Sequence, residues 1–190
     1  MTKEKLYNEL NYVNHSREKR IFYANMLIEQ SEMMPILLEI LFQVDDKISC
    51  RAAWVLEFVF GAKLEILKPH LELFTSQINK VHLDSAVRPV AKICEYIAID
   101  HYKNKASKPK LSLTDTHKER IIENCFDWMI NDEKIAPKAY AMHTLFLFGK
   151  EFDWIYPELK NILERDYEYQ SSGFKARARK IIGWIEKQGN

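Results

Sequence analysis

The chain reads VDDKISCRAA at residues 44–53 and LDSAVRPVA at residues 83–91. In both stretches an Asp is followed by a cation, Arg51 or Arg88, and then by Ala, where helical spacing of apolar residues resumes. An Asp in a turn can accept backbone N–H groups at a helix start, and a cation can pair with it. The two stretches therefore predict one turn-and-helix unit that is used twice.

Two later stretches extend this pattern at a regular distance. NDEKIAPKA carries Lys138, and QSSGFK carries Lys175 without an aligned Asp. Arg51 and Arg88 stand 37 residues apart, as do Lys138 and Lys175, whereas 50 separate the two middle cations. The 37-residue units share further markers, which are Phe60-Gly61 then Pro69 in one and Phe148-Gly149 then Pro157 in the other. A period of this size is typical of repeats built from helix pairs.

These turns resemble the inter-helix turns of HEAT repeats, in which an Asp in the turn and an Arg at the next helix start recur from unit to unit. The resemblance covers most of the chain, with Lys replacing Arg in the last two units. It implies a HEAT/armadillo-like protein, with an all-α fold in which about five HEAT-like helix pairs form a right-handed α-α superhelix. It also implies a concave face lined by the second helix of each pair.

Apolar residues recur at helical spacing along nearly the whole chain, without the strict alternation that marks strands. We expect a helix with Pro89 in its first turn, and another that ends at Gly149 as its C-cap. The longer middle unit takes its extra residues from a polar stretch at about 103–116, which predicts an inserted loop. The whole chain, residues 1–190, is expected to form a single helical-repeat domain.

Composition excludes several classes of protein. The chain has 190 residues, 47% of them apolar, and its 28 basic and 27 acidic residues leave a formal charge of +1. Disordered chains combine low hydrophobicity with high net charge, so this chain is not one of them. A polybasic nucleic-acid binder would show a clear positive excess. Only five glycines are present, which disfavours a loop-rich all-β fold.

Cysteine usage and the N-terminal sequence predict a cytoplasmic protein. Cys50, Cys94 and Cys125 are far apart, odd in number and inside apolar helical patterns, which is typical of reduced, buried thiols. The first ten residues contain no apolar core of a secretory signal. No apolar run approaches the roughly 18 residues that cross a bilayer, so no membrane interaction is expected.

We assign no catalytic, cofactor-binding or metal-binding residue and do not expect an enzyme. The six histidines form no pair at metal-ligand spacing, and the glycines are too scattered for a phosphate-binding loop. His143 is expected as a hydrogen-bonded residue of the core or a groove. Glu123 and Asp127 share a helix face beside Trp128 and could hold a cation or act as acid and base, although an outer polar face is the favoured interpretation.

Basic residues gather in the predicted insertion and in the last helix, where they could neutralise phosphates. Alkylpurine DNA glycosylases are also built from HEAT-like repeats and use a Trp, an Asp and an Arg in a groove. Trp128, Asp127 and Arg165 offer those residue types without the surrounding motif, so their roles are not transferred. The candidate nucleic-acid-binding residues are Lys103, Lys105, Lys108, Lys110, Lys175, Arg177, Arg179 and Lys180.

These observations predict a non-enzymatic scaffold that binds a protein or peptide through its concave face. The alternative is a nucleic-acid-binding or DNA-base-repair domain that uses the basic loop and the C-terminal helix. A small-molecule or lyase activity in the groove is a third hypothesis. A solvated face and a charged end cap would explain the basic clusters without any function.

Overall fold

The protein is built from helices throughout residues 2–103 and 111–188, the residues that this computed structural model describes. Those residues contain no strand, so the all-α prediction is confirmed. The α-helices are α1 (Lys3–Leu10), α2 (Arg17–Glu29), α3 (Met34–Leu41), α4 (Lys47–Ala62), α5 (Leu71–Gln77), α6 (Asp84–Lys103), α7 (Asp115–Ile130), α8 (Ile135–Phe148), α9 (Ile155–Asp166) and α10 (Ser172–Glu186). Short 3-10 helices lie between some of them, namely η1 (Ser31–Met33), η2 (Leu64–His70), η3 (Ile78–Lys80) and η4 (Tyr167–Tyr169).

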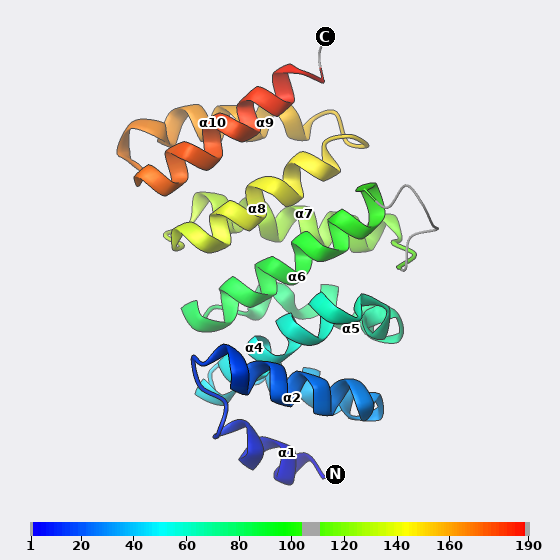
Figure 1. Cartoon of the computed structure of the whole chain (residues 1–190). Helices are drawn as coiled ribbons and strands as arrows, with labels where there is room; N and C mark the ends of the chain where they lie inside the picture. The colour runs from blue at the N-terminus through cyan, green and yellow to red at the C-terminus, as the bar shows by residue number, and fades with distance from the viewer. Residues whose placement is uncertain (1, 104–110, 189–190) are drawn as a thin grey trace.

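The even-numbered α-helices pack side by side in chain order, α2 on α4, α4 on α6, α6 on α8 and α8 on α10. Helix α3 packs on α4, helices α7 and α9 pack on α8, and α5 packs on α7. Figure 1 shows the resulting stack, with the two termini at opposite ends and with α7 and α9 behind α8 and α10. We call the surface formed by α2, α4, α6, α8 and α10 the even-helix face. That the helix pairs are HEAT-like repeats, and that they form a right-handed superhelix, stay predictions.

Helix α6 begins at Asp84, so Pro89 lies inside the helix and not in its first turn as predicted. A proline lacks an N–H group and leaves the carbonyl four residues earlier without its helical partner. The indole Nε1 of Trp54 in α4 donates to this carbonyl, that of Ser85, at 2.7 Å. A side chain of a neighbouring helix therefore supplies the missing donor, and α6 continues past the proline.

The two turn aspartates of the repeat behave differently. Asp46 precedes α4, and its carboxylate accepts from the backbone N–H of Ile48 at 2.9 Å, as predicted. Asp84 is instead the first residue of α6 and pairs with Lys134 at 2.7 Å. Only the first of these residues is therefore an N-cap of the expected kind.

The four repeated cations all bond to a residue that precedes them in the chain. None of them pairs with a turn Asp in the described part of the protein, so that prediction is wrong. Three bond to backbone carbonyls near a helix end, where unpaired carbonyls and the helix dipole favour a cation. The bonds are those of Arg51 to Leu10 at 3.2 Å and to Asn11, of Arg88 to Glu57 at 2.6 Å, of Lys138 to Met129 at 3.1 Å and of Lys175 to Glu168 at 3.1 Å.

The two glycines at matching repeat positions each pack against a tyrosine. A Cβ atom on Gly61 would lie 3.1 Å from Oη of Tyr96, and one on Gly149 would lie 2.2 Å from Cε1 of Tyr156. Neither glycine has a positive φ angle. The close approach of an aromatic ring, and not an unusual backbone conformation, therefore accounts for glycine at 149, whereas Gly61 makes a looser contact of the same kind. Gly149 is the C-cap of α8 as predicted, whereas Gly61 lies inside α4.

The three cysteines lie in the core. Cys50, Cys94 and Cys125 are buried free thiols, which confirms the prediction of burial. Burial raises the pKa of the Cys94 and Cys125 thiols well above its ordinary value. These cysteines therefore act as small apolar residues in the packing of α4, α6 and α7.

The ends of the predicted insertion at about 103–116 are helical. Lys103 is the last residue of α6, and Asp115 is the first residue of α7. Residues 104–110, which include Lys105, Lys108 and Lys110, lie outside the described residues. No helix among residues 2–103 and 111–188 is long and apolar enough to span a bilayer.

Candidate functional site

Four hollows follow one another across the even-helix face, and each shares lining residues with the next. Arg20 and Arg88 line both the first and the second, Gly61 and Tyr96 line the second and third, and Lys103 lines the third and fourth. Their lining residues come from the five even-numbered helices and the residues that adjoin them. We call this connected set of hollows, which runs from α2 to α10, the hollowed strip.

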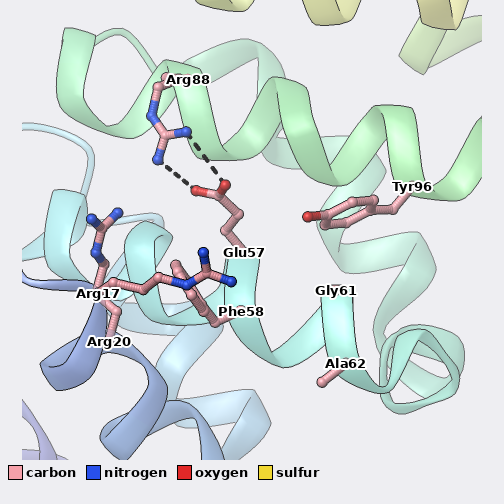
Figure 2. A pocket seen from close by; sticks show the side chains of 8 residues that line it. All are labelled: Arg17, Arg20, Glu57, Phe58, Gly61, Ala62, Arg88 and Tyr96. Atoms are coloured by element: carbon pink, nitrogen blue, oxygen red, sulfur yellow. Dashed lines mark hydrogen bonds and ion pairs between the residues drawn. The ribbon is translucent and has the colours of Figure 1, made fainter.

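The second hollow is a pocket of about 520 Å³ that we call the arginine pocket, lined by Arg17, Arg20, Glu57, Phe58, Gly61, Ala62, Arg88 and Tyr96. Figure 2 shows Arg17 and Arg20 on the α2 side, across from the ion pair of Glu57 with Arg88. Two hydrogen bonds join that pair, at 2.6 Å and 3.3 Å. Because Glu57 is buried and uses two of the five N–H donors of Arg88, it fixes the guanidinium and leaves three donors available.

The other two arginines of the pocket have no carboxylate partner among the described residues. Arg20 donates to the carbonyl of His15 at 2.6 Å, and its guanidinium lies 5.3 Å from the ring centre of Phe58 and 5.9 Å from that of Trp54. Three arginines against one glutamate give the arginine pocket a formal charge of +2. Forked guanidinium groups on aromatic faces suit the binding of a carboxylate or a phosphate.

A buried ionic network joins α6 to α8 beside the third hollow. Nδ1 of His143 lies 2.6 Å from one oxygen of Glu95, and Nζ of Lys92 lies 2.5 Å from the other. Burial acts to raise the pKa of Glu95, but the hydrogen bonds and charges of His143 and Lys92 outweigh it and hold this pKa below its ordinary value. Nε2 of His143 lies 2.9 Å from Nζ of Lys103. His143 is therefore a hydrogen-bonded residue at the border of the core and the strip, as predicted.

The fourth hollow combines lysines with aromatic rings and is lined by Lys103, Phe146, Lys150, Trp184, Lys187 and Gln188. Trp184 lies 5.2 Å from Phe146 between ring centres, and Nζ of Lys180 lies 5.0 Å from the centre of its ring. Partial burial and the charges of Lys150 and Lys180 lower the pKa of Lys103. Lys150 and Lys187 have no carboxylate partner in the part of the chain that is described, so this end of the strip is also positive.

The predicted nucleic-acid-binding residues that the structure describes lie near different parts of the protein. Lys103 lines the hollowed strip, and Lys180 lies beside its last hollow. Lys175 and Arg179 turn instead toward Tyr167, where Arg179 donates to the phenolic oxygen at 3.1 Å. Arg177 is half-buried on α10 and lines none of the four hollows. The basic residues of the last helix therefore contact two different aromatic rings, Tyr167 and Trp184.

Sequence reasoning missed the arginine pocket, although Arg88 was recognised as a repeated cation. Its positive charges come from α2 and α6, which no sequence spacing links. The only available signal was the spacing of Arg17 and Arg20 within the first turn of α2.

The residue types shared with DNA glycosylases do not form one site. Trp128 is buried, Asp127 lines a hollow on α7, and Arg165 bonds to Asp166 at 2.6 Å. In the ranges 2–103 and 111–188, no three His, Cys, Asp or Glu side chains stand together as a group that could hold a metal ion.

Comparisons of the chain with protein-family models, with curated proteins and with solved structures gave no match.

Proposed function

We propose that this protein is a non-enzymatic scaffold that binds an extended acidic segment of a partner protein along the hollowed strip. In this proposal the helix pairs are HEAT-like repeats, and the even-helix face is the concave face of their right-handed superhelix. The three free buried thiols agree with a cytoplasmic setting, where cysteines stay reduced.

One observation carries the proposal, namely that the connected hollows contain cations without carboxylate partners among the described residues. Arg17 and Arg20 stand at the α2 end, and Lys150 and Lys187 stand at the α10 end. Complementary charge on a partner would neutralise both ends and would set its direction and register. Half-buried aromatic rings beside these cations, Phe58 and Trp184 among them, offer apolar contacts to the same segment.

A polypeptide is favoured over a nucleic acid because the strip is not uniformly basic. Glu57 pairs with Arg88, and Asp84 pairs with Lys134, so carboxylates stand among the cations on the lining of the first two hollows. A phosphodiester backbone places charge at every step and would be repelled there. A peptide can place acidic side chains opposite the cations and neutral ones opposite the ion pairs.

Fluorescence anisotropy with a labelled acidic peptide tests the proposal. Packed helices lie about 10 Å apart, so five of them span about 40 Å, which an extended peptide of about 12 residues covers. We expect the double variant Arg17→Glu/Arg20→Glu to weaken binding by at least about tenfold. The control is Lys19→Glu/Lys68→Glu, which changes charge equally at two exposed positions that line no part of the strip. Equal affinity of both variants, or no binding at low salt, contradicts the proposal.

A second candidate, single-stranded nucleic acid, is favoured by the fourth hollow alone. There Lys103, Lys150 and Lys187 line the hollow together with Trp184, and such sites bind single strands by stacking a base on the ring while cations pair with the phosphates. A labelled 12-nucleotide strand distinguishes this function. Its binding should fall steeply with salt and should be lost in Trp184→Ala, whereas binding of the acidic peptide should depend mainly on Arg17 and Arg20.

A further inference from the structure

A hollow on α7 differs in kind from the hollowed strip and shares no lining residue with it. It has a volume of about 420 Å³ and is lined by Glu119, Ile122, Glu123, Phe126, Asp127, Phe152 and Trp154. All of these residues come from α7 and from the turn that leads into α9. We call it the α7 hollow. It contains no basic residue, whereas the strip is rich in them.

An exposed aromatic ring forms one wall of the α7 hollow. The rings of Phe126 and Trp154 stack with their centres 5.6 Å apart and their planes 23° apart. Phe126 is half-buried, whereas 54% of the surface of Trp154 is exposed to solvent. A large aromatic residue held in place by stacking and still exposed is a preformed platform for a flat group.

Carboxylates of α7 line the same hollow. Glu119, Glu123 and Asp127 follow one another at intervals of four residues, so they lie on one side of α7. None has a cationic partner in the described residues, and like charges at this spacing destabilise a helix. The three do not form a group that could hold a metal ion. All three carboxylates are exposed to solvent, so an organic cation of sufficient size can contact more than one of them.

We propose that the α7 hollow binds an arginine side chain of a basic partner polypeptide. The guanidinium would stack on the free face of Trp154 and donate hydrogen bonds to the carboxylates of α7. A planar guanidinium satisfies both requirements at once, because it stacks on aromatic faces and forms paired hydrogen bonds with carboxylates. A lysine ammonium can also lie over an aromatic ring, but it is a point charge with no flat face to stack and no paired donors, so the hollow favours arginine.

The probes are three pentapeptides in which glycine alternates with arginine, with lysine or with glutamate. Calorimetry and tryptophan fluorescence measure their binding. The arginine peptide should bind at least about fivefold more tightly than the lysine peptide. The glutamate peptide belongs to the strip in the proposed function, so Trp154→Ala should leave its affinity unchanged. Trp154→Ala should remove this preference for arginine. The triple variant Glu119→Gln/Glu123→Gln/Asp127→Asn should weaken the arginine peptide by at least about tenfold.

Matched controls separate the site from general effects of charge and exposure. Phe22→Ala removes another exposed aromatic ring, and Glu18→Gln/Glu29→Gln/Glu32→Gln removes three other exposed carboxylates. Both controls should bind the arginine peptide like the unmodified protein. Circular dichroism verifies that every variant is folded. Equal affinity for arginine and lysine peptides overturns the proposal, as does a preference for arginine that survives Trp154→Ala. Concentration-dependent dimerisation abolished by Trp154→Ala also overturns it, because a second copy would then occupy the hollow.

Discussion

The ring of Tyr156 occupies the space in which a side chain at Gly149 would lie, with Cε1 only 2.2 Å from an ideal Cβ position. Gly149→Ala must therefore displace this ring, which packs against Phe146 with centres 5.8 Å apart. We expect the variant to lose about 1 to 3 kcal/mol of unfolding free energy, the usual cost of overpacking. Urea denaturation followed by circular dichroism measures it.

Gly183 provides the matched control for that substitution. It lies in α10, and a Cβ atom there would meet no atom within 4 Å. Gly183→Ala should therefore stabilise the protein by about 0.5 to 1 kcal/mol, since alanine favours the helix. If both substitutions change stability by the same amount, helix propensity alone governs both positions and the contact with Tyr156 is irrelevant.

The indole N–H of Trp54 is expected to support α6 at its internal proline. In Trp54→Phe the carbonyl of Ser85 loses its donor at 2.7 Å, because Pro89 cannot replace it. We expect a loss of about 1 kcal/mol in unfolding free energy. In Trp54→Phe/Pro89→Ala the backbone supplies the donor again, so the loss should largely disappear. A loss unchanged by the second substitution would assign the effect to packing of the indole ring instead.

The ionic network of Glu95 predicts a pH dependence of stability. The pKa of Glu95 is lowered in the folded protein, so its contribution is complete above the ordinary value of 4.5 and is lost as the pH falls through the folded value. Glu95→Gln leaves Lys92 and His143 without their carboxylate and should cost about 3 kcal/mol at neutral pH. The difference in stability between unmodified and variant protein should shrink below pH 4.5. Urea denaturation at several pH values measures this difference, and one that stays constant across the range contradicts the prediction.

The buried cysteines should be chemically inert in the folded state. Burial raises the pKa of Cys94 and Cys125, which keeps both as unreactive thiols. In the Cys50→Ala variant, a thiol reagent should modify the remaining two cysteines only as fast as the protein unfolds. The same reagent in denaturant measures the intrinsic rate. Fast modification under native conditions would show that α6 and α7 open independently of global unfolding.

Sequence patterns predicted the features that depend on residues close together in the chain. The helices, the burial of the cysteines and the C-cap at Gly149 all follow from local spacing. Features that depend on distant partners were missed or wrong. Pro89 was expected near a helix start because a proline inside a helix leaves a carbonyl without a donor. The donor to that carbonyl, on Ser85, comes from Trp54, which is 31 residues away and gives no local signal.

The candidate sites show the same limit. The arginine pocket joins Arg17 to Arg88, and the α7 hollow joins Asp127 to Trp154. The carboxylates Glu123 and Asp127 were singled out beside Trp128, but that tryptophan is buried. The aromatic ring that lines the hollow with these carboxylates is that of Trp154, the residue that precedes α9. Neither combination has a signal in residue spacing.

The bonds of the repeated cations have a direction along the chain. The acceptors of Arg51, Arg88, Lys138 and Lys175 all stand earlier in the sequence than the cations themselves. During synthesis from the N-terminus, each helix that carries one of these cations therefore meets an acceptor that has already been made. No repeated cation therefore has to wait for a later segment to find its acceptor.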